Sequence, residues 1–276
     1  MKVYIQVDFE GIAGMIEWDD YITDTHSAHE KRSRLRHILT DEVNAAVLGA
    51  QDAGADEILV WDSHGPSNNC NNIYFEDLDP CADIIIGWKG IPSFYPLLDD
   101  SFDAGLYIGG HAMAGSEHAV LPHTKTVLNS IDYGEVGMFA AMCGWFDVPM
   151  VFVSGDRTTV EEVQNCVPDV EYVITKESFS PYAARIMAPK RVQKQIREGA
   201  EKALQKTDSI KPVQIGPPFT ITTSKKEITG DDLFELFNLY VDPDGEIFGN
   251  QDVQPERDRI QNKRKKWKEN DSFLAP

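Results

Sequence analysis

The fold is decided at the start of the chain, where residues 2–14 read KVYIQVDFEGIAG. Lys2–Val7 is a short β-rich run without strict alternation of polar and apolar positions. Such a run is typical of a strand buried on both faces of a largely parallel sheet. Asp8 and Glu10 follow it directly, and polar residues beyond the carboxyl end of such a strand indicate a possible ligand site.

Similar apolar runs recur along the first 180 residues and alternate with helical patterns. The further runs are Glu57–Trp61, Ala82–Gly87, Ala104–Gly109, Pro149–Ser154 and Glu171–Thr175. The helical patterns cover Glu30–Ala53, Gly134–Phe146 and Thr158–Asn165. This alternation predicts an α/β fold with a mostly parallel central sheet flanked by helices.

The alternation of apolar runs and helical patterns ends after residue 175. The segments expected there are a helix over Pro181–Gln205, β-like runs over Val213–Ile215 and Phe219–Thr223, and a helix over Asp231–Tyr240. Pro189 should interrupt or restart the first of these helices. We therefore expect an α/β domain over residues 1–180 and a smaller C-terminal α+β domain over residues 181–276 with a charged tail.

The composition excludes several classes of partner. The 276 residues include 26 Lys and Arg against 45 Asp and Glu, a net charge of −19, which repels nucleic acids and anionic membranes. The basic run Lys263–Lys268 is read as a solvated helix face or tail. No run approaches the ~18–20 apolar residues of a membrane span, and the N-terminus does not read as a signal peptide. Four cysteines without CxxC spacing favour free thiols in a reducing cytoplasm.

Polar side chains follow three of the predicted strands at their carboxyl ends. Asp8 and Glu10 lie two positions apart, so they share one face while the chain stays extended. His64 follows the second run, His111 follows the fourth, and Glu135 opens a predicted helix. Because ligands of open α/β sheets bind beyond these strand ends, we expect the five side chains at one edge.

Carboxylate and imidazole groups together suit a metal ion. Zinc accepts both, and a mixed set of oxygen and nitrogen ligands also suits Mn²⁺ or Co²⁺. One aspartate could bridge two ions ~3.5–4 Å apart. Each residue alone is more readily explained as a turn or helix cap, but all of them together at strand ends are less easily explained in this way, so spacing leaves both interpretations open. The chain contains no HExxH, G-x-S-x-G or nucleotide-binding glycine motif.

These residues, in this order, resemble the M55 family of metallopeptidases, the D-aminopeptidases linked to dipeptide-transport operons. The most specific matches are D-x-E-G-I-x-G over residues 8–14 and D-S-H over residues 62–64. The others are GGHA over residues 109–112, PHT over 122–124 and GEVG over 134–137. The resemblance covers residues 1 to about 206, and a weaker resemblance is found in the predicted helix Asp231–Tyr240.

The resemblance implies a cytoplasmic aminopeptidase that favours D-amino-acid peptides, holds two zinc ions per subunit and assembles as a ring-like homodecamer. It implies five zinc ligands, of which the first would bridge the two ions: Asp8, Glu10, His64, His111 and Glu135. The reaction implied is hydrolysis of the N-terminal peptide bond of a short peptide by a water that the two metals activate.

The catalytic histidine of the family corresponds to His123, in a loop that also contains His118. His123 could act as general base, nucleophile or oxyanion donor. Asp62 could orient a ligand histidine or act as a cap. The loop before Glu135 is shorter than is usual in the family, which affects the expected substrate pocket. Residues 241–276 do not resemble the usual family ending.

Two other functions stay open at this stage. A two-metal hydrolase could act on another amide, an ester or a phosphate ester, because the ligand set alone does not select the substrate. A non-catalytic metal-binding scaffold could keep the same residues without turnover.

Overall fold

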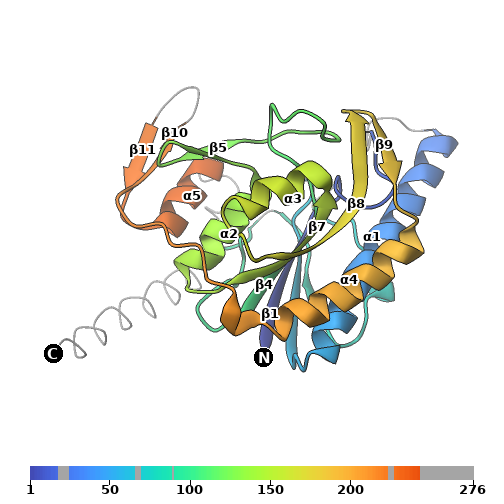
Figure 1. Cartoon of the computed structure of the whole chain (residues 1–276), viewed down its shortest axis with the longest axis horizontal. Helices are drawn as coiled ribbons and strands as arrows, with labels where there is room; N and C mark the ends of the chain where they lie inside the picture. Colours follow the sequence, from blue (N-terminus) through green and yellow to red (C-terminus); the bar gives the residue numbers. More distant parts are fainter. Residues whose placement is uncertain (18–24, 66–69, 89, 223–226, 243–276) are drawn as a thin grey trace.

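The computed structural model describes residues 1–17, 25–65, 70–88, 90–222 and 227–242, which form two sheets packed with helices (Figure 1). The larger sheet has seven strands in the order β3-β2-β1-β4-β7-β8-β9. They are β1 (Lys2–Val7), β2 (Glu57–Asp62), β3 (Asp83–Ile85), β4 (Ala104–Gly110), β7 (Met150–Asp156), β8 (Glu171–Ser180) and β9 (Ala183–Ile186). All pairings are parallel except that of β9 with β8, which confirms the predicted mostly parallel sheet.

Helices flank this sheet on both sides. They are α1 (His26–Asp52), α2 (Glu135–Trp145), α3 (Arg157–Gln164) and α4 (Pro189–Leu204). Helices α1 and α4 pack against each other on one face, and α2 and α3 pack together on the other (Figure 1). Helix α1 begins four residues before the predicted start because Thr25 Oγ1 accepts a hydrogen bond from the Ala28 amide at 3.2 Å.

The connections reverse direction between the neighbouring strands β1 and β4. Strand β1 leads through α1 to β2 on one side, whereas β4 leads to β7 on the other. At such a switch point the connections diverge, and open α/β sheets bind ligands in the resulting crevice. Asp8 follows β1 and His111 follows β4, so both lie at this crevice.

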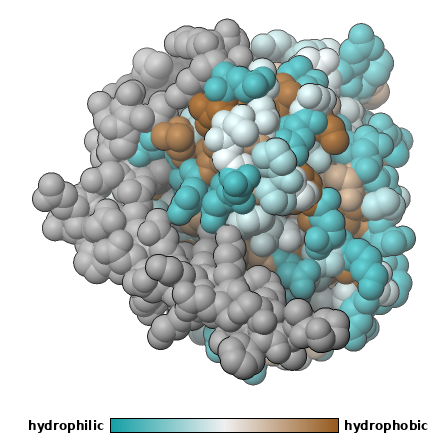
Figure 2. Space-filling model, turned by 90° about the vertical axis from the view of Figure 1, so that its left-hand side faces the viewer, coloured by the Kyte–Doolittle hydropathy of each residue, from teal (hydrophilic) through white to brown (hydrophobic). Residues whose placement is uncertain are grey.

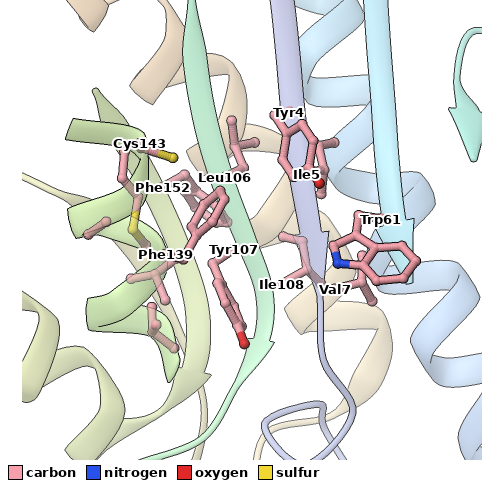
Figure 3. Close-up of a cluster of buried hydrophobic side chains, with 14 of the residues drawn as sticks. Tyr4, Ile5, Val7, Trp61, Leu106, Tyr107, Ile108, Phe139, Cys143 and Phe152 are labelled. Carbon is pink, nitrogen blue, oxygen red and sulfur yellow. The ribbon is translucent and has the colours of Figure 1, made fainter. Parts of the chain in front are cut away.

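Large apolar side chains fill the space beside the sheet (Figure 3). Tyr4, Trp61, Phe139 and Phe152 are all fully buried. Burial of each such side chain contributes about 1.5–3 kcal/mol to folding. The packing of these side chains therefore fixes the positions of the strands that end at the crevice.

A smaller antiparallel sheet lies beside the larger one, in the order β11-β10-β5-β6. Its strands are β5 (Thr126–Leu128), β6 (Ile131–Tyr133), β10 (Phe219–Thr222) and β11 (Glu227–Gly230). Helix α5 (Leu233–Val241) packs on β10 and β11. The C-terminal part thus combines strands and a helix as predicted. On the side shown in Figure 2, the described apolar residues lie in small groups among polar ones.

Two predictions for residues 181–216 are wrong. The helix expected over Pro181–Gln205 begins only at Pro189, because residues 183–186 pair with β8 as strand β9. Pro189 occupies the first turn of α4, where its missing N–H is not needed. The expected run Val213–Ile215 is not a strand. Prolines at 212, 217 and 218 flank it and cannot donate ladder hydrogen bonds.

The division at residues 180 and 181 stays a prediction about folding units. Strand β9 extends the larger sheet, and β10 pairs with β5, so elements from both parts share both sheets. Residues 243–276, with most of the charged tail and its basic run, lie outside the described residues. Among the described helices, none is long and apolar enough to cross a membrane. The four cysteines are free thiols, as predicted.

Candidate metal centre

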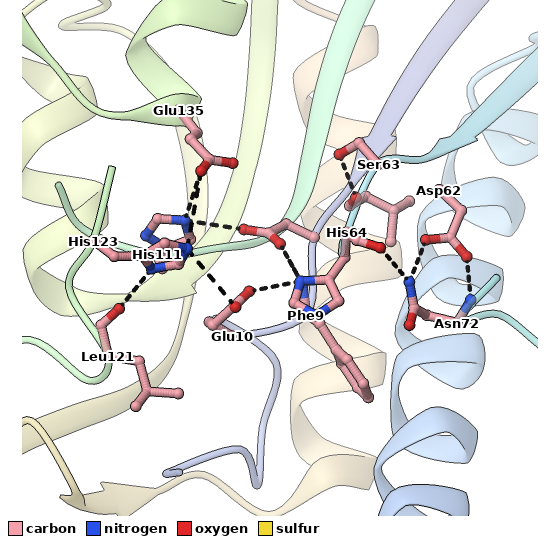
Figure 4. A network of polar contacts seen from close by, with 12 residues as sticks. Phe9, Glu10, Asp62, Ser63, His64, Asn72, His111, Leu121, His123 and Glu135 are labelled. Atoms are coloured by element: carbon pink, nitrogen blue, oxygen red, sulfur yellow. Dashed lines mark hydrogen bonds and ion pairs between the residues drawn. The ribbon is translucent and has the colours of Figure 1, made fainter. Parts of the chain in front are cut away.

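The predicted site residues all lie at the carboxyl edge of the larger sheet (Figure 4). They come from the segment after β1, the ends of β2 and β4, the loop before β5, and the first turn of α2: Asp8, Glu10, His64, His111, His123 and Glu135. Residues up to 127 positions apart in the chain thus form one polar network, divided into two clusters.

The first cluster comprises Asp8, Glu10 and His64. His64 Nδ1 lies 3.0 Å from Asp8 Oδ1 and 3.0 Å from Glu10 Oε2. The exposed fractions of the three side chains are 4%, 1% and 11%. One ligand atom from each lies within 4.8 Å of the others, so the three could hold one metal ion.

The second cluster comprises His111, His123 and Glu135, and their ligand atoms also lie within 4.8 Å of one another. His111 Nε2 is 3.5 Å from Glu135 Oε1, and His123 Nε2 is 4.0 Å from the same oxygen. The two imidazole rings stack with centroids 3.8 Å apart and planes 14° apart. His123, expected as a catalytic residue only, is therefore also within reach of a metal in this cluster.

Asp8 lies between the two clusters. Its Oδ1 is 3.0 Å from His64 Nδ1, and its Oδ2 is 3.5 Å from His111 Nε2. The two oxygens of one carboxylate therefore face different clusters, the geometry by which a carboxylate can bridge two metal ions.

Three buried polar atoms in the centre make no hydrogen bond within the described part of the chain. They are Asp8 Oδ2, Glu10 Oε2 and His111 Nε2. Each lies 3.0–3.5 Å from a titratable group of the centre, but a buried polar atom that lacks a hydrogen bond costs about 1–3 kcal/mol. Metal ions at this position would satisfy all three atoms, so the residues fit a metal centre.

Backbone carbonyls orient two of the histidines. His111 Nδ1 lies 2.9 Å from Ala112 O, and His123 Nδ1 lies 2.9 Å from Leu121 O. Each Nδ1 therefore carries a proton and donates it to a carbonyl, and Nε2 faces the carboxylates. Metal-binding histidines are commonly fixed by such a contact on the second ring nitrogen.

The carboxylates make the centre attractive to cations. Burial alone would lower the pKa of His111, but the charges of Glu135, Asp8 and Glu10 raise it to about 10. Burial would also lower the pKa of His64, but Glu10 and Asp8 raise it well above its usual value. Burial would raise the pKa of Asp8, but the hydrogen bond with His64 and the charge of His111 lower it. Protons and metal ions thus compete for the same position.

Asp62 supports the centre through hydrogen bonds to Asn72 and Ile73. Its carboxylate accepts hydrogen bonds from the Asn72 amide at 2.5 Å, Asn72 Nδ2 at 2.9 Å and the Ile73 amide at 3.1 Å. Asn72 Nδ2 also lies 2.8 Å from His64 O. Of the two roles considered for Asp62, the structure supports the cap, which closes the loop that carries His64.

Close packing of two strand ends explains the glycines of the site motifs. A Cβ at Gly11 would lie 2.0 Å from Gly110 O, and one at Gly109 would lie 2.2 Å from Asp8 O. Gly109 also has φ +77°, which other residues rarely adopt. The glycines let β1 and β4 approach, and this approach places Asp8 beside His111.

Glu42 fixes the segment after Glu10, and its burial gives a prediction for stability. Glu42 Oε1 accepts a hydrogen bond from the Ala13 amide at 2.9 Å. Burial raises the pKa of Glu42 from 4.5 to about 8. Between these values the native state keeps a proton that the unfolded chain has lost, so stability falls as pH rises from about 4.5 to 8.

Replacing Glu42 by glutamine should remove this loss, because the amide oxygen can still accept from Ala13 without titrating. Urea unfolding between pH 5 and 8 should show the variant gaining stability over the wild type by up to about 1.4 kcal/mol per pH unit. A difference that does not change with pH would show that Glu42 is already ionised in the native protein.

Comparison with known proteins places the chain among the peptidases. The family model Peptidase M55, described as D-aminopeptidase, matches residues 1–246. The chain belongs to the M55 family. A D-aminopeptidase of Bacillus subtilis (strain 168) is 34% identical over 219 residues, which cover 77% of each protein.

A solved D-aminopeptidase structure supports the same assignment. The Zn-dependent D-aminopeptidase DppA from Bacillus subtilis, a self-compartmentalizing protease, matches with a TM-score of 0.80 and 26% identity. The match covers 91% of this chain and 99% of that one. These similarities confirm the predicted family, the α/β fold and the prediction of a peptide-bond hydrolase.

Proposed function

We propose that this M55 protein is a zinc aminopeptidase that holds two zinc ions per subunit and removes the N-terminal residue of short peptides, with a preference for D-amino acids. The pair of adjoining clusters, with Asp8 between them and three buried polar atoms without hydrogen bonds, carries the proposal. Zinc is favoured because the similar DppA is Zn-dependent. Mn²⁺ or Co²⁺ would suit the same ligand atoms.

Five residues are the proposed ligands. Glu10 and His64 would hold one ion and His111 and Glu135 the other, with Asp8 shared between them. Five ligands on two ions leave positions open for substrate, as a catalytic site requires. When bound, the zinc pair supplies Lewis-acid polarisation of a peptide carbonyl and an activated water at neutral pH.

His123 is the proposed catalytic residue. Its side chain is 32% exposed, so it can reach a substrate that the buried His111 cannot. Its Nε2 faces Glu10 Oε1 at 3.9 Å and Glu135 Oε1 at 4.0 Å. Leu121 O fixes the ring, and Nε2 is thereby placed to exchange a proton with the substrate or to donate to a developing oxyanion.

Replacement of His123 by alanine is expected to lower kcat by about 10²–10⁴-fold while both zinc ions are retained. Turnover and zinc content should be measured on the same preparation, with His118→Ala from the same loop as the matched control. Wild-type turnover with full zinc would reject the role of His123 and direct attention to His118. Loss of one zinc ion would instead make His123 a ligand.

Zinc binding is expected to release protons. The neighbouring carboxylates raise the pKa of His64 and of His111 and so favour the protonated rings, whereas a zinc ligand must be a neutral imidazole. Calorimetric titration in buffers of different ionisation enthalpy should show protons released on zinc binding and an affinity that rises with pH. Binding without proton release would contradict the proposed ligands.

Substrate preference can be tested directly with chromogenic substrates. The zinc-loaded protein should hydrolyse D-Ala p-nitroanilide faster than L-Ala p-nitroanilide and should leave a phosphomonoester intact. Turnover of the phosphomonoester alone would support a different two-metal hydrolase. Two bound zinc ions without any turnover would support a metal-binding scaffold.

We also propose that the protein forms a homo-oligomer, a homodecamer, in the cytoplasm. The similar DppA is self-compartmentalizing, and the four free cysteines suit a reducing compartment. Light scattering should then give a particle of ten times the 30.9 kDa chain. A monomer at working concentrations would contradict this assembly.

A further inference from the structure

The segment that carries the proposed ligands Asp8 and Glu10 is held by a strand that is not its neighbour. Strand β8 is separated from β1 by β4 and β7. Lys176 on β8 nevertheless reaches across the carboxyl edge of the sheet to the segment Glu10–Met15. The contact therefore joins two parts of the chain about 160 residues apart.

Lys176 uses its whole hydrogen-bonding capacity on this segment. Its Nζ donates to Glu10 O, to Ile12 O at 2.9 Å and to Met15 O at 2.6 Å. An ammonium group has three N–H donors, so none is left for another segment. The preceding residue acts on the same segment, because Thr175 Oγ1 lies 2.5 Å from Gly11 O.

Lys176 is completely buried, which is unusual for a lysine. Removing an ammonium group from water is costly unless hydrogen bonds and opposite charges compensate. The carboxylates of Asp156, Glu10 and Asp8 favour its charged form. Because a fully buried group cannot meet a peptide substrate, Lys176 can affect the reaction only through the residues it holds.

We propose that Lys176 is a positioning residue of the metal centre, which fixes the Glu10–Met15 segment so that the carboxylates of Asp8 and Glu10 are in place before metal binds. The inference rests on the proposed function. Ligands that are already ordered bind a metal more tightly, because less conformational freedom is lost on binding. Thr175 assists by holding Gly11.

Lys176→Met tests this role, because methionine keeps much of the apolar stem and lacks the ammonium group. Competition with a chelator, well below the melting temperature, should show the Kd of at least one zinc ion raised about 10–100-fold. The visible spectrum of the Co²⁺-substituted protein should change. The kcat should fall with little change in KM, because Lys176 does not contact the peptide.

Two further variants separate positioning from general destabilisation. Thr175→Val removes the hydroxyl, which lies 2.5 Å from Gly11 O and 3.0 Å from Gly155 O, and should raise the same Kd to a smaller extent. This variant keeps the proposal testable if Lys176→Met fails to fold. Ile196→Ala creates a cavity at a fully buried position of α4 and should lower the melting temperature without changing the zinc Kd.

The outcomes distinguish this inference from the function on which it rests. A wild-type protein that does not bind two zinc ions would overturn both. A wild-type protein that binds them, beside folded Lys176 and Thr175 variants with unchanged Kd and spectrum, would overturn the positioning role alone. An equal loss of zinc affinity in Ile196→Ala would also overturn it, because the effect would then follow from stability.

Discussion

Replacing His111 by alanine is expected to lower kcat/KM by at least about 10³-fold and to remove one of the two proposed zinc ions. The side chain is only 1% exposed, and its Nε2 lies 3.5 Å from both Asp8 Oδ2 and Glu135 Oε1. Loss of the ring removes a proposed ligand and leaves two carboxylates facing each other without a cation. Activity and zinc content should be measured on one preparation, and circular dichroism should show that the fold is kept.

His26→Ala is the matched control for this variant. His26 lies in the first turn of α1, is 89% exposed and contacts only Glu30 among the ion pairs described. Its replacement should change neither activity nor zinc content. If His111→Ala kept full activity and two zinc ions, the proposed centre would be wrong.

Asp8→Asn is expected to have a comparable effect on kcat/KM, at least about 10³-fold, and to reduce zinc from the two proposed ions to at most one. Asparagine has almost the same shape, and its Oδ1 can still accept the hydrogen bond that Asp8 Oδ1 accepts from the Phe9 amide at 2.8 Å. The amide nitrogen cannot ligate a metal. The fold should therefore persist while the bridge between the two clusters is lost.

An aspartate outside the centre controls for the chemical change. Asp83 lies exposed at the start of β3, and Asp83→Asn should behave like the wild type. Two zinc ions and wild-type kcat in Asp8→Asn would show that no carboxylate bridge is needed.

The central fold could be predicted because its strands are buried on both faces. Strands β4 and β7 are buried along their whole length and β1 is buried after Lys2, so all three consist mostly of apolar residues, and helical patterns separate the strands. The site followed from the same pattern, because polar residues at the ends of buried strands meet at one edge of a parallel sheet.

Short strands could not be found in the same way. Strands β5, β6, β9 and β11 have three or four residues each, too few for a periodic pattern, and each forms by antiparallel pairing with a strand adjacent to it in the sequence. The exposed residues of β9 resemble a helix surface in sequence. Only the hydrogen bonds to β8 make this segment a strand.

Two features of the centre also lacked a sequence signal. The stacking of His123 on His111 depends on how the loop before β5 folds back, which no spacing reveals. Lys176 stands between Thr175 and Glu177, where a lysine is usually read as exposed. Its burial depends on backbone carbonyls near the start of the chain, so the role of Lys176 can be recognised only from the structure.

Diffraction at the zinc absorption edge, from crystals of the purified protein, tests the proposed metal centre most directly. We expect two anomalous peaks per subunit, one beside Glu10 and His64 and the other beside His111 and Glu135, with Asp8 between them. Zinc bound elsewhere, or six side chains that pair only with one another around no metal, would contradict the proposed aminopeptidase mechanism.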